Sequence, residues 1–123
     1  MEMRLLRRDN IDGVERMEIS GEVTRNGWVS DDQDPLVQLY GGDIYSQRVM
    51  MNLSKAAYID SLGVDWLLKT HRRFQKAGGR MILHSPSEFC KQLLQMMRMN
   101  LVLEISPTET AAAEAMHEEQ HGN

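Results

Sequence analysis

The chain has 123 residues, which is enough for one domain with a single hydrophobic core. Apolar residues make up 41% and charged residues 26%, as in ordinary globular proteins, and the net charge of −4 argues against a general nucleic-acid binder. The single cysteine, Cys90, excludes an intramolecular disulfide and indicates a reducing compartment. Because no apolar run is long enough to cross a bilayer and the N-terminus lacks a signal-peptide core, we expect a cytoplasmic protein without a membrane span.

The first part of the chain is expected to form strands. Residues 4–9 predict an edge strand, and turn residues at 10–13 join it to a second strand over residues 14–20. Residues 22–28 carry several β-type side chains and predict a further short strand. These segments together indicate an N-terminal antiparallel hairpin.

A short helix and a buried strand are expected next. Residues 35–40 predict the helix, because Asp34 has an N-cap side chain and Gly41 is a residue type that ends helices. Residues 43–48 are expected to be a loop that leads into an apolar strand over residues 49–53.

The longest helix is predicted to begin near Ser61 and to end at residues 77–79. Its apolar stripe, at helical spacing, consists of Val64, Leu67, Leu68, His71, Phe74 and Ala77. Basic residues lie mostly off that stripe, namely Lys69, Arg72, Arg73 and Lys76, with Arg80 following. We expect this basic face to be solvated, and an acidic partner surface is the alternative.

A strand and a second long helix follow. Residues 80–84 predict a short buried strand that ends at His84. Ser85 and Glu88 have the spacing of a capping box, with Pro86 at the first helical position. The apolar face of this helix is expected to consist of Phe89, Leu93, Met96 and Met97.

The end of the chain completes an α/β pattern. Residues 101–105 predict a last strand, residues 107–116 a last helix, and residues 117–123 a frayed polar tail. Strands separated by helices pair in parallel through right-handed connections. We therefore expect one domain over residues 1–116, with a mixed sheet of about four to six strands, mostly parallel, and about four flanking helices.

The corner before the longest helix is the candidate functional site. Asp60 and Ser61 are both N-cap residue types, and they follow the central strand directly. A hydroxyl at this place should lie near solvent, beside unpaired N–H groups at the positive end of the helix dipole. A phosphate group added there would be electrostatically favoured and would change the surface strongly.

Four segments, in this order, resemble the signature of STAS domains, the family of the anti-sigma factor antagonists and of a related module in sulphate transporters. These segments are Asn52-Leu53-Ser54, Tyr58-Ile59-Asp60-Ser61-Leu62-Gly63, Leu67-Leu68 and Ala77-Gly78-Gly79-Arg80-Met81-Ile82-Leu83. The resemblance covers essentially the whole chain, and its core extends over residues 49–105.

The resemblance implies a partner-switching regulator that is not an enzyme and needs no cofactor or metal. In anti-sigma factor antagonists the serine after the aspartate is phosphorylated by the anti-sigma factor, which is itself a serine kinase, and phosphorylation prevents binding. Ser61 matches that serine. The expected partner-binding residues are Asp60, Ser61, Leu62, Gly63 and Trp66. A homo-oligomer is left open, and direct contact with nucleic acid is not expected.

The sequence departs from the family pattern at two positions. Leu62 stands where a second hydroxyl residue is usual, and Thr24 follows Gly21-Glu22-Val23 where the family often has an aspartate. The alternative function is therefore a STAS scaffold, or an accessory subunit of a signalling or transport complex, that is not phosphorylated.

Single residues also allow other interpretations. Ser61 could serve only as a helix cap, and Trp66 could either be an exposed anchor or pack under the loop over residues 31–48. His117 and His121 have a metal-compatible spacing, but a polar tail explains them without a metal. A hydrolase that uses Ser61 is disfavoured, because the surrounding residues are not the Gly-x-Ser-x-Gly nucleophile elbow.

Overall fold

The computed structural model describes residues 3–24 and 34–121. A five-stranded sheet with the order β1-β2-β3-β4-β5 forms its centre. The strands are β1 (Arg4–Ile11), β2 (Val14–Val23), β3 (Arg48–Ile59), β4 (Arg80–His84) and β5 (Ile105–Ser106). Strands β1 and β2 are antiparallel, and the other neighbours are parallel. The predicted mixed sheet with an N-terminal hairpin is thus confirmed.

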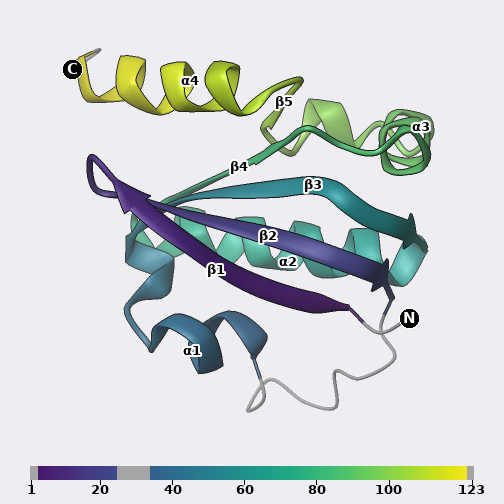
Figure 1. The fold of residues 1–123 in the computed structure, drawn as a ribbon, viewed down its shortest axis with the longest axis horizontal. Coiled ribbons are helices and arrows are strands. Elements are labelled where there is room, and N and C mark those ends of the chain that lie inside the picture. Colours follow the sequence, from purple (N-terminus) through teal and green to yellow (C-terminus); the bar gives the residue numbers. More distant parts are fainter. Residues whose placement is uncertain (1–2, 25–33, 122–123) are drawn as a thin grey trace.

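Four α-helices surround the sheet (Figure 1). Within the described residues they are α1 (Pro35–Tyr40), α2 (Ser61–Ala77), α3 (Glu88–Met96) and α4 (Glu109–His121). The same residues include the 3-10 turns η2 (Ile44–Ser46) and η3 (Met99–Leu101). Figure 1 shows α2 running behind β2 and β3, with α4 above them.

The two faces of the sheet bury different residues. On one face, buried side chains from α1, α2 and α3 form the main core with alternate strand residues such as Met51 and Leu83. Between these positions, Met50 and Ile82 point to the other face and pack against α4. This period-2 alternation is what places helices on both faces of the sheet. His71 and His84 are buried, at 6% and 2% exposure, as their positions in the sequence indicated.

Strand β3 is longer than predicted. It has 12 residues and continues to Ile59, so the predicted end of this strand at residue 53 is wrong. Strand β2 likewise continues to Val23, which replaces the first part of the separate strand predicted over residues 22–28. The rest of that predicted strand, from residue 25, lies outside the described residues.

Helix α3 differs from the prediction at its start and in its buried face. Its N-cap is Ser87, whose hydroxyl accepts a hydrogen bond from the Cys90 amide, so the capping box built on Ser85 is wrong. Cys90 and Leu94 are its buried residues, whereas Phe89 and Met96 of the predicted face are 46% and 79% exposed.

The segment between α3 and α4 is mostly not a strand. Residues 99–101 form η3, and only Ile105–Ser106 pair with β4 as β5, so the strand predicted over residues 101–105 is largely wrong. The left-handed conformation of Arg98, with φ 58°, turns the chain tightly after α3. Helix α4 extends to His121, beyond the end predicted near Met116.

Candidate functional site

The corner between β3 and α2 is built on the cap that Asp60 supplies. Asp60 has an extended backbone, and its carboxylate Oδ1 accepts a hydrogen bond of 2.8 Å from the Gly63 amide. The Asp60 carbonyl accepts the first helical hydrogen bond, from the Val64 amide at 2.9 Å. The carboxylate and the carbonyl of Asp60 therefore satisfy two amides that the start of α2 would otherwise leave unpaired.

Gly63 brings the first turn of α2 against the end of β2. It is buried, and a Cβ added there would overlap the carbonyl oxygen of Val23 and lie 2.8 Å from its carbonyl carbon. The Asp60 amide also donates to the Val23 carbonyl, at 3.4 Å. Gly63 therefore positions the corner, and its own backbone faces β2 instead of solvent.

Ser61 and Leu62 form the exposed part of the corner. Ser61 is the first residue of α2 and is exposed, and Leu62 beside it is 47% exposed. The hydroxyl of Ser61 lies at the positive end of a helix of 17 residues. This place can accommodate a phosphate group, because helix N-termini favour anions.

Trp66 is only partly available to a partner. It is half-buried and packs against the main core, one turn along α2 from Leu62. The predicted site residues thus fall into three kinds. Ser61 and Leu62 are exposed, Asp60 and Trp66 are half-buried, and Gly63 is buried.

The prediction missed an aromatic pair near the corner. Tyr58, close to the end of β3, and Phe89, at the start of α3, are both exposed, and their ring centroids lie 5.0 Å apart. Phe89 was expected in the core because it fits a helical apolar stripe. The burial of Ile59 makes the adjacent Tyr58 point to the opposite face of β3, but no sequence pattern places Phe89 beside it.

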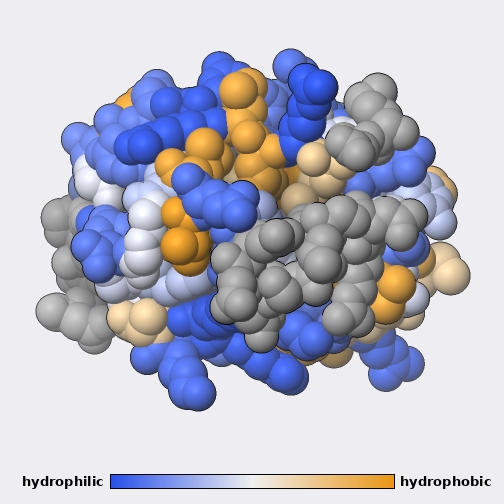
Figure 2. All heavy atoms as spheres, turned by 90° about the horizontal axis from the view of Figure 1, so that it is seen from below, coloured by the Kyte–Doolittle hydropathy of each residue, from blue (hydrophilic) through white to orange (hydrophobic). Residues whose placement is uncertain are grey.

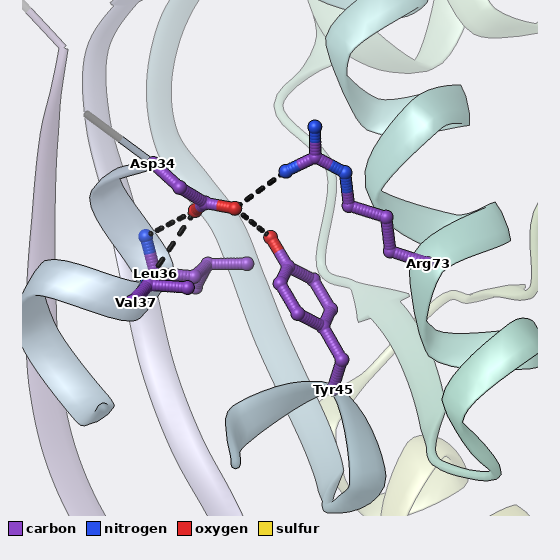
Figure 3. Close-up of polar contacts among 5 residues, drawn as sticks. All are labelled: Asp34, Leu36, Val37, Tyr45 and Arg73. Atoms are coloured by element: carbon purple, nitrogen blue, oxygen red, sulfur yellow. Dashed lines mark hydrogen bonds and ion pairs between the residues drawn. The ribbon is translucent and has the colours of Figure 1, made fainter. Parts of the chain in front are cut away.

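A polar cluster away from the corner fixes α1 to α2 (Figure 3). Asp34 caps α1 by accepting from the Leu36 amide at 2.9 Å, and its other carboxylate oxygen accepts from Tyr45 and from Arg73 of α2. Burial, followed by the hydrogen bond to Asp34, raises the pKa of Tyr45. We assign this cluster a structural role, because Asp34 is 8% exposed and its carboxylate bonds to groups within the protein.

The described residues offer little for other chemistry. They contain no group of three or more His, Cys, Asp or Glu side chains placed to hold a metal ion. No helix among them is both long and apolar enough to span a membrane. Apolar surface also exists away from the corner, since Figure 2 shows a band of hydrophobic atoms on the side where α1 lies in Figure 1.

Comparison with known proteins supplies the family. The model of the STAS domain family matches residues 8–112, which includes the corner, β3 and α2. No curated protein matches the chain by sequence.

Solved structures with the same fold include proteins named as anti-sigma factor antagonists. One from Mycobacterium paratuberculosis shares 19% identity, with 93% of each chain covered and a TM-score of 0.63. An anti-sigma-factor antagonist (STAS) domain protein from Planctomyces limnophilus shares 17% identity, with 94% of this chain and 97% of that chain covered and a TM-score of 0.62. The Bacillus cell fate determinant SpoIIAA in its phosphorylated form shares 16% identity, with 92% and 99% covered and a TM-score of 0.61. At these identities the similarity shows the fold.

Proposed function

Since the chain belongs to the STAS domain family, we propose that it is an anti-sigma factor antagonist that binds an anti-sigma factor with serine kinase activity and is released by phosphorylation at Ser61. The observation that carries the proposal is the exposed Ser61 at the capped N-terminus of α2. The protein then acts by binding and not by catalysis, in the cytoplasm, and without direct contact to nucleic acid.

Phosphorylation at this place changes the surface without requiring a change of fold. A phosphoserine adds about −1.5 to −2 charges and three acceptor oxygens. The N-terminus of α2 favours that charge, and the Asp60 cap already fixes the backbone around it. A partner surface that fits an uncharged serine would instead face an unpaired, partly desolvated anion, which is costly to bury.

The solved relatives support this kind of function. The anti-sigma factor antagonist SpoIIAA has been solved in its unphosphorylated form. A second structure of SpoIIAA represents the phosphorylated form. The proposal extends the same modification to Ser61 of this chain.

Leu62 favours a second candidate function. Its half-exposed apolar side chain stands where the family usually has a hydroxyl. An apolar contact at this position suits a stable scaffold or accessory subunit whose binding does not depend on Ser61. This function predicts a partner that binds the Ser61→Asp variant as tightly as it binds the unmodified chain.

Mass spectrometry after incubation with the partner kinase and ATP tests the phosphorylation step. The kinase is first isolated from the source cell with the wild-type chain as bait and is identified. We expect one phosphate per chain, on Ser61, and none on the Ser61→Ala variant. A wild-type chain that binds the kinase but stays unmodified would favour the scaffold function instead.

A further inference from the structure

The second half of β3 extends beyond its neighbour β4. The pairing between the two strands ends at Asn52 and His84. Beyond that point the start of α3 takes the place of a strand, because the Ser87 amide donates to the Leu53 carbonyl at 3.3 Å and the Ser87 hydroxyl to the Ala56 carbonyl at 2.8 Å. The first turn of α3 is therefore held on β3 by its own N-cap residue.

This attachment brings two exposed aromatic side chains together. Tyr58 is 41% and Phe89 46% exposed, and their rings are tilted by 37° at a centroid distance of 5.0 Å. Each ring is adjacent in sequence to a residue that is buried, Ile59 and Cys90. The contact between the two rings limits the motion of both, which lowers the side-chain entropy that a partner would cost them on binding.

The pair lies next to the proposed switch. Tyr58 is three residues before Ser61, so their Cα atoms are separated by at most about 11 Å. A protein interface of standard size covers about 800 Å² on each partner, which is much wider than this separation. An interface of this width centred on Ser61 is large enough to include the aromatic pair.

We propose that Tyr58 and Phe89 form the apolar anchor of the interface with the anti-sigma kinase, an inference that rests on the proposed function. Aromatic side chains in contact are the usual source of binding energy in interfaces, whereas exposed serines contribute little. The two parts of the surface then have separate roles. The aromatic pair supplies affinity in the unphosphorylated state, and Ser61 supplies the charge that ends binding.

Calorimetric titration of the identified kinase with Phe89→Ala tests the anchor. We expect the dissociation constant to rise about tenfold or more, as for hot-spot aromatics. Met96→Ala is the matched control, since Met96 lies at the other end of α3 and is 79% exposed. This control should stay within about twofold of the wild type. Tyr58→Thr provides an independent variant on β3, in case Phe89→Ala loosens α3 in thermal unfolding.

Phosphorylation kinetics give a second measurement. Because the proposed anchor contributes binding and not chemistry, Phe89→Ala should raise the KM for phosphorylation of Ser61 and leave kcat unchanged. Equal dissociation constants for folded Phe89→Ala, Tyr58→Thr and Met96→Ala would overturn the anchor while leaving the proposed function intact. A wild-type chain that binds no anti-sigma kinase would overturn both.

Discussion

At the scale of single residues, Asp60 determines the geometry of the corner. Its side chain caps α2 through the Gly63 amide, and its backbone links the corner to Val23 of β2. Because Asp60 already supplies the cap, the hydroxyl of Ser61 is not required for that purpose. The alternative in which Ser61 serves only as the N-cap is therefore wrong for this structure.

Replacing Asp60 with alanine should destabilise the protein by about 1 kcal/mol, the usual cost of losing an N-cap. Asp60→Asn keeps an oxygen that can accept from the Gly63 amide and is the control. Urea unfolding at neutral pH measures both variants. Equal free energies of unfolding for Asp60→Ala and the wild type would show that the cap contributes nothing.

Two buried histidines link stability to pH. Burial lowers the pKa of both His71 and His84 from the ordinary value of 6.5, and for His71 the nearby Glu104 opposes and Arg72 reinforces this effect. Below pH 6.5 the unfolded chain takes up protons that the folded chain resists. The stability that depends on these two histidines being neutral is therefore fully present above pH 6.5. It is lost as the pH falls from 6.5 toward the lowered pKa values of the folded state.

We expect His71→Leu to weaken this dependence on pH. The Nδ1 atom of His71 is buried without a hydrogen-bond partner among the described residues, so leucine removes a titrating group without breaking a hydrogen bond there. Urea unfolding between pH 7.5 and 5 should give a shallower decline for the variant than for the wild type. Equally steep declines in the free energy of unfolding would mean that His71 has the same pKa in the folded and unfolded states.

At the scale of elements, the site depends on how closely α2 approaches β2. Gly63 permits this approach, since any Cβ there would meet the backbone of Val23. Backbone cannot move aside as the end of a flexible side chain can, so the first turn of α2 would have to shift. The corner that carries Ser61 would shift with it.

Gly63→Ala should therefore destabilise the protein by about 1–3 kcal/mol or more, as overpacking does. Gly42→Ala is the matched control, because a Cβ at Gly42 has no heavy atom within 4 Å. That control should lie within about 0.5 kcal/mol of the wild type in urea unfolding. Similar stability of the two variants would refute the close approach.

The length of β3 could not be predicted from the sequence. The prediction ended β3 too early, because two bulges interrupt its pairing with β2. The register shifts between Glu18 and Ser20 and again between Gly21 and Glu22. At such bulges two successive residues, for example Ser54 and Lys55, are exposed, and the period-2 pattern that identifies a strand is lost. A bulge is determined by the partner strand, which local periodicity does not reveal.

Helix α3 shows a second limit. The stripe beginning at Phe89 and the stripe beginning at Cys90 both have helical spacing. The Ser87 contacts with β3 orient the helix so that Cys90 and Leu94 are buried and Phe89 is exposed. Such contacts between distant segments are outside what a single-sequence pattern contains, and for this reason the aromatic pair was not predicted.

At the scale of the whole molecule, the prediction was more successful. The alternation of apolar strands and amphipathic helices gave the mixed sheet, because strong periodicity and end signals such as Asp60 and Gly78 coincide around α2. The family match over residues 8–112 agrees with the resemblance that these motifs carry. The exposure of Ser61 at the corner follows from the fold as a whole and supports its proposed role as a switch.

The most direct test of that role is the affinity of the anti-sigma kinase for the wild-type chain, Ser61→Ala and Ser61→Asp, measured by calorimetric titration without ATP. We predict that Ser61→Ala binds like the wild type, since alanine adds no charge, and that Ser61→Asp loses at least about tenfold in affinity, because the interface would bury an unpaired charge. Equal affinities of all three chains for the kinase would contradict the account.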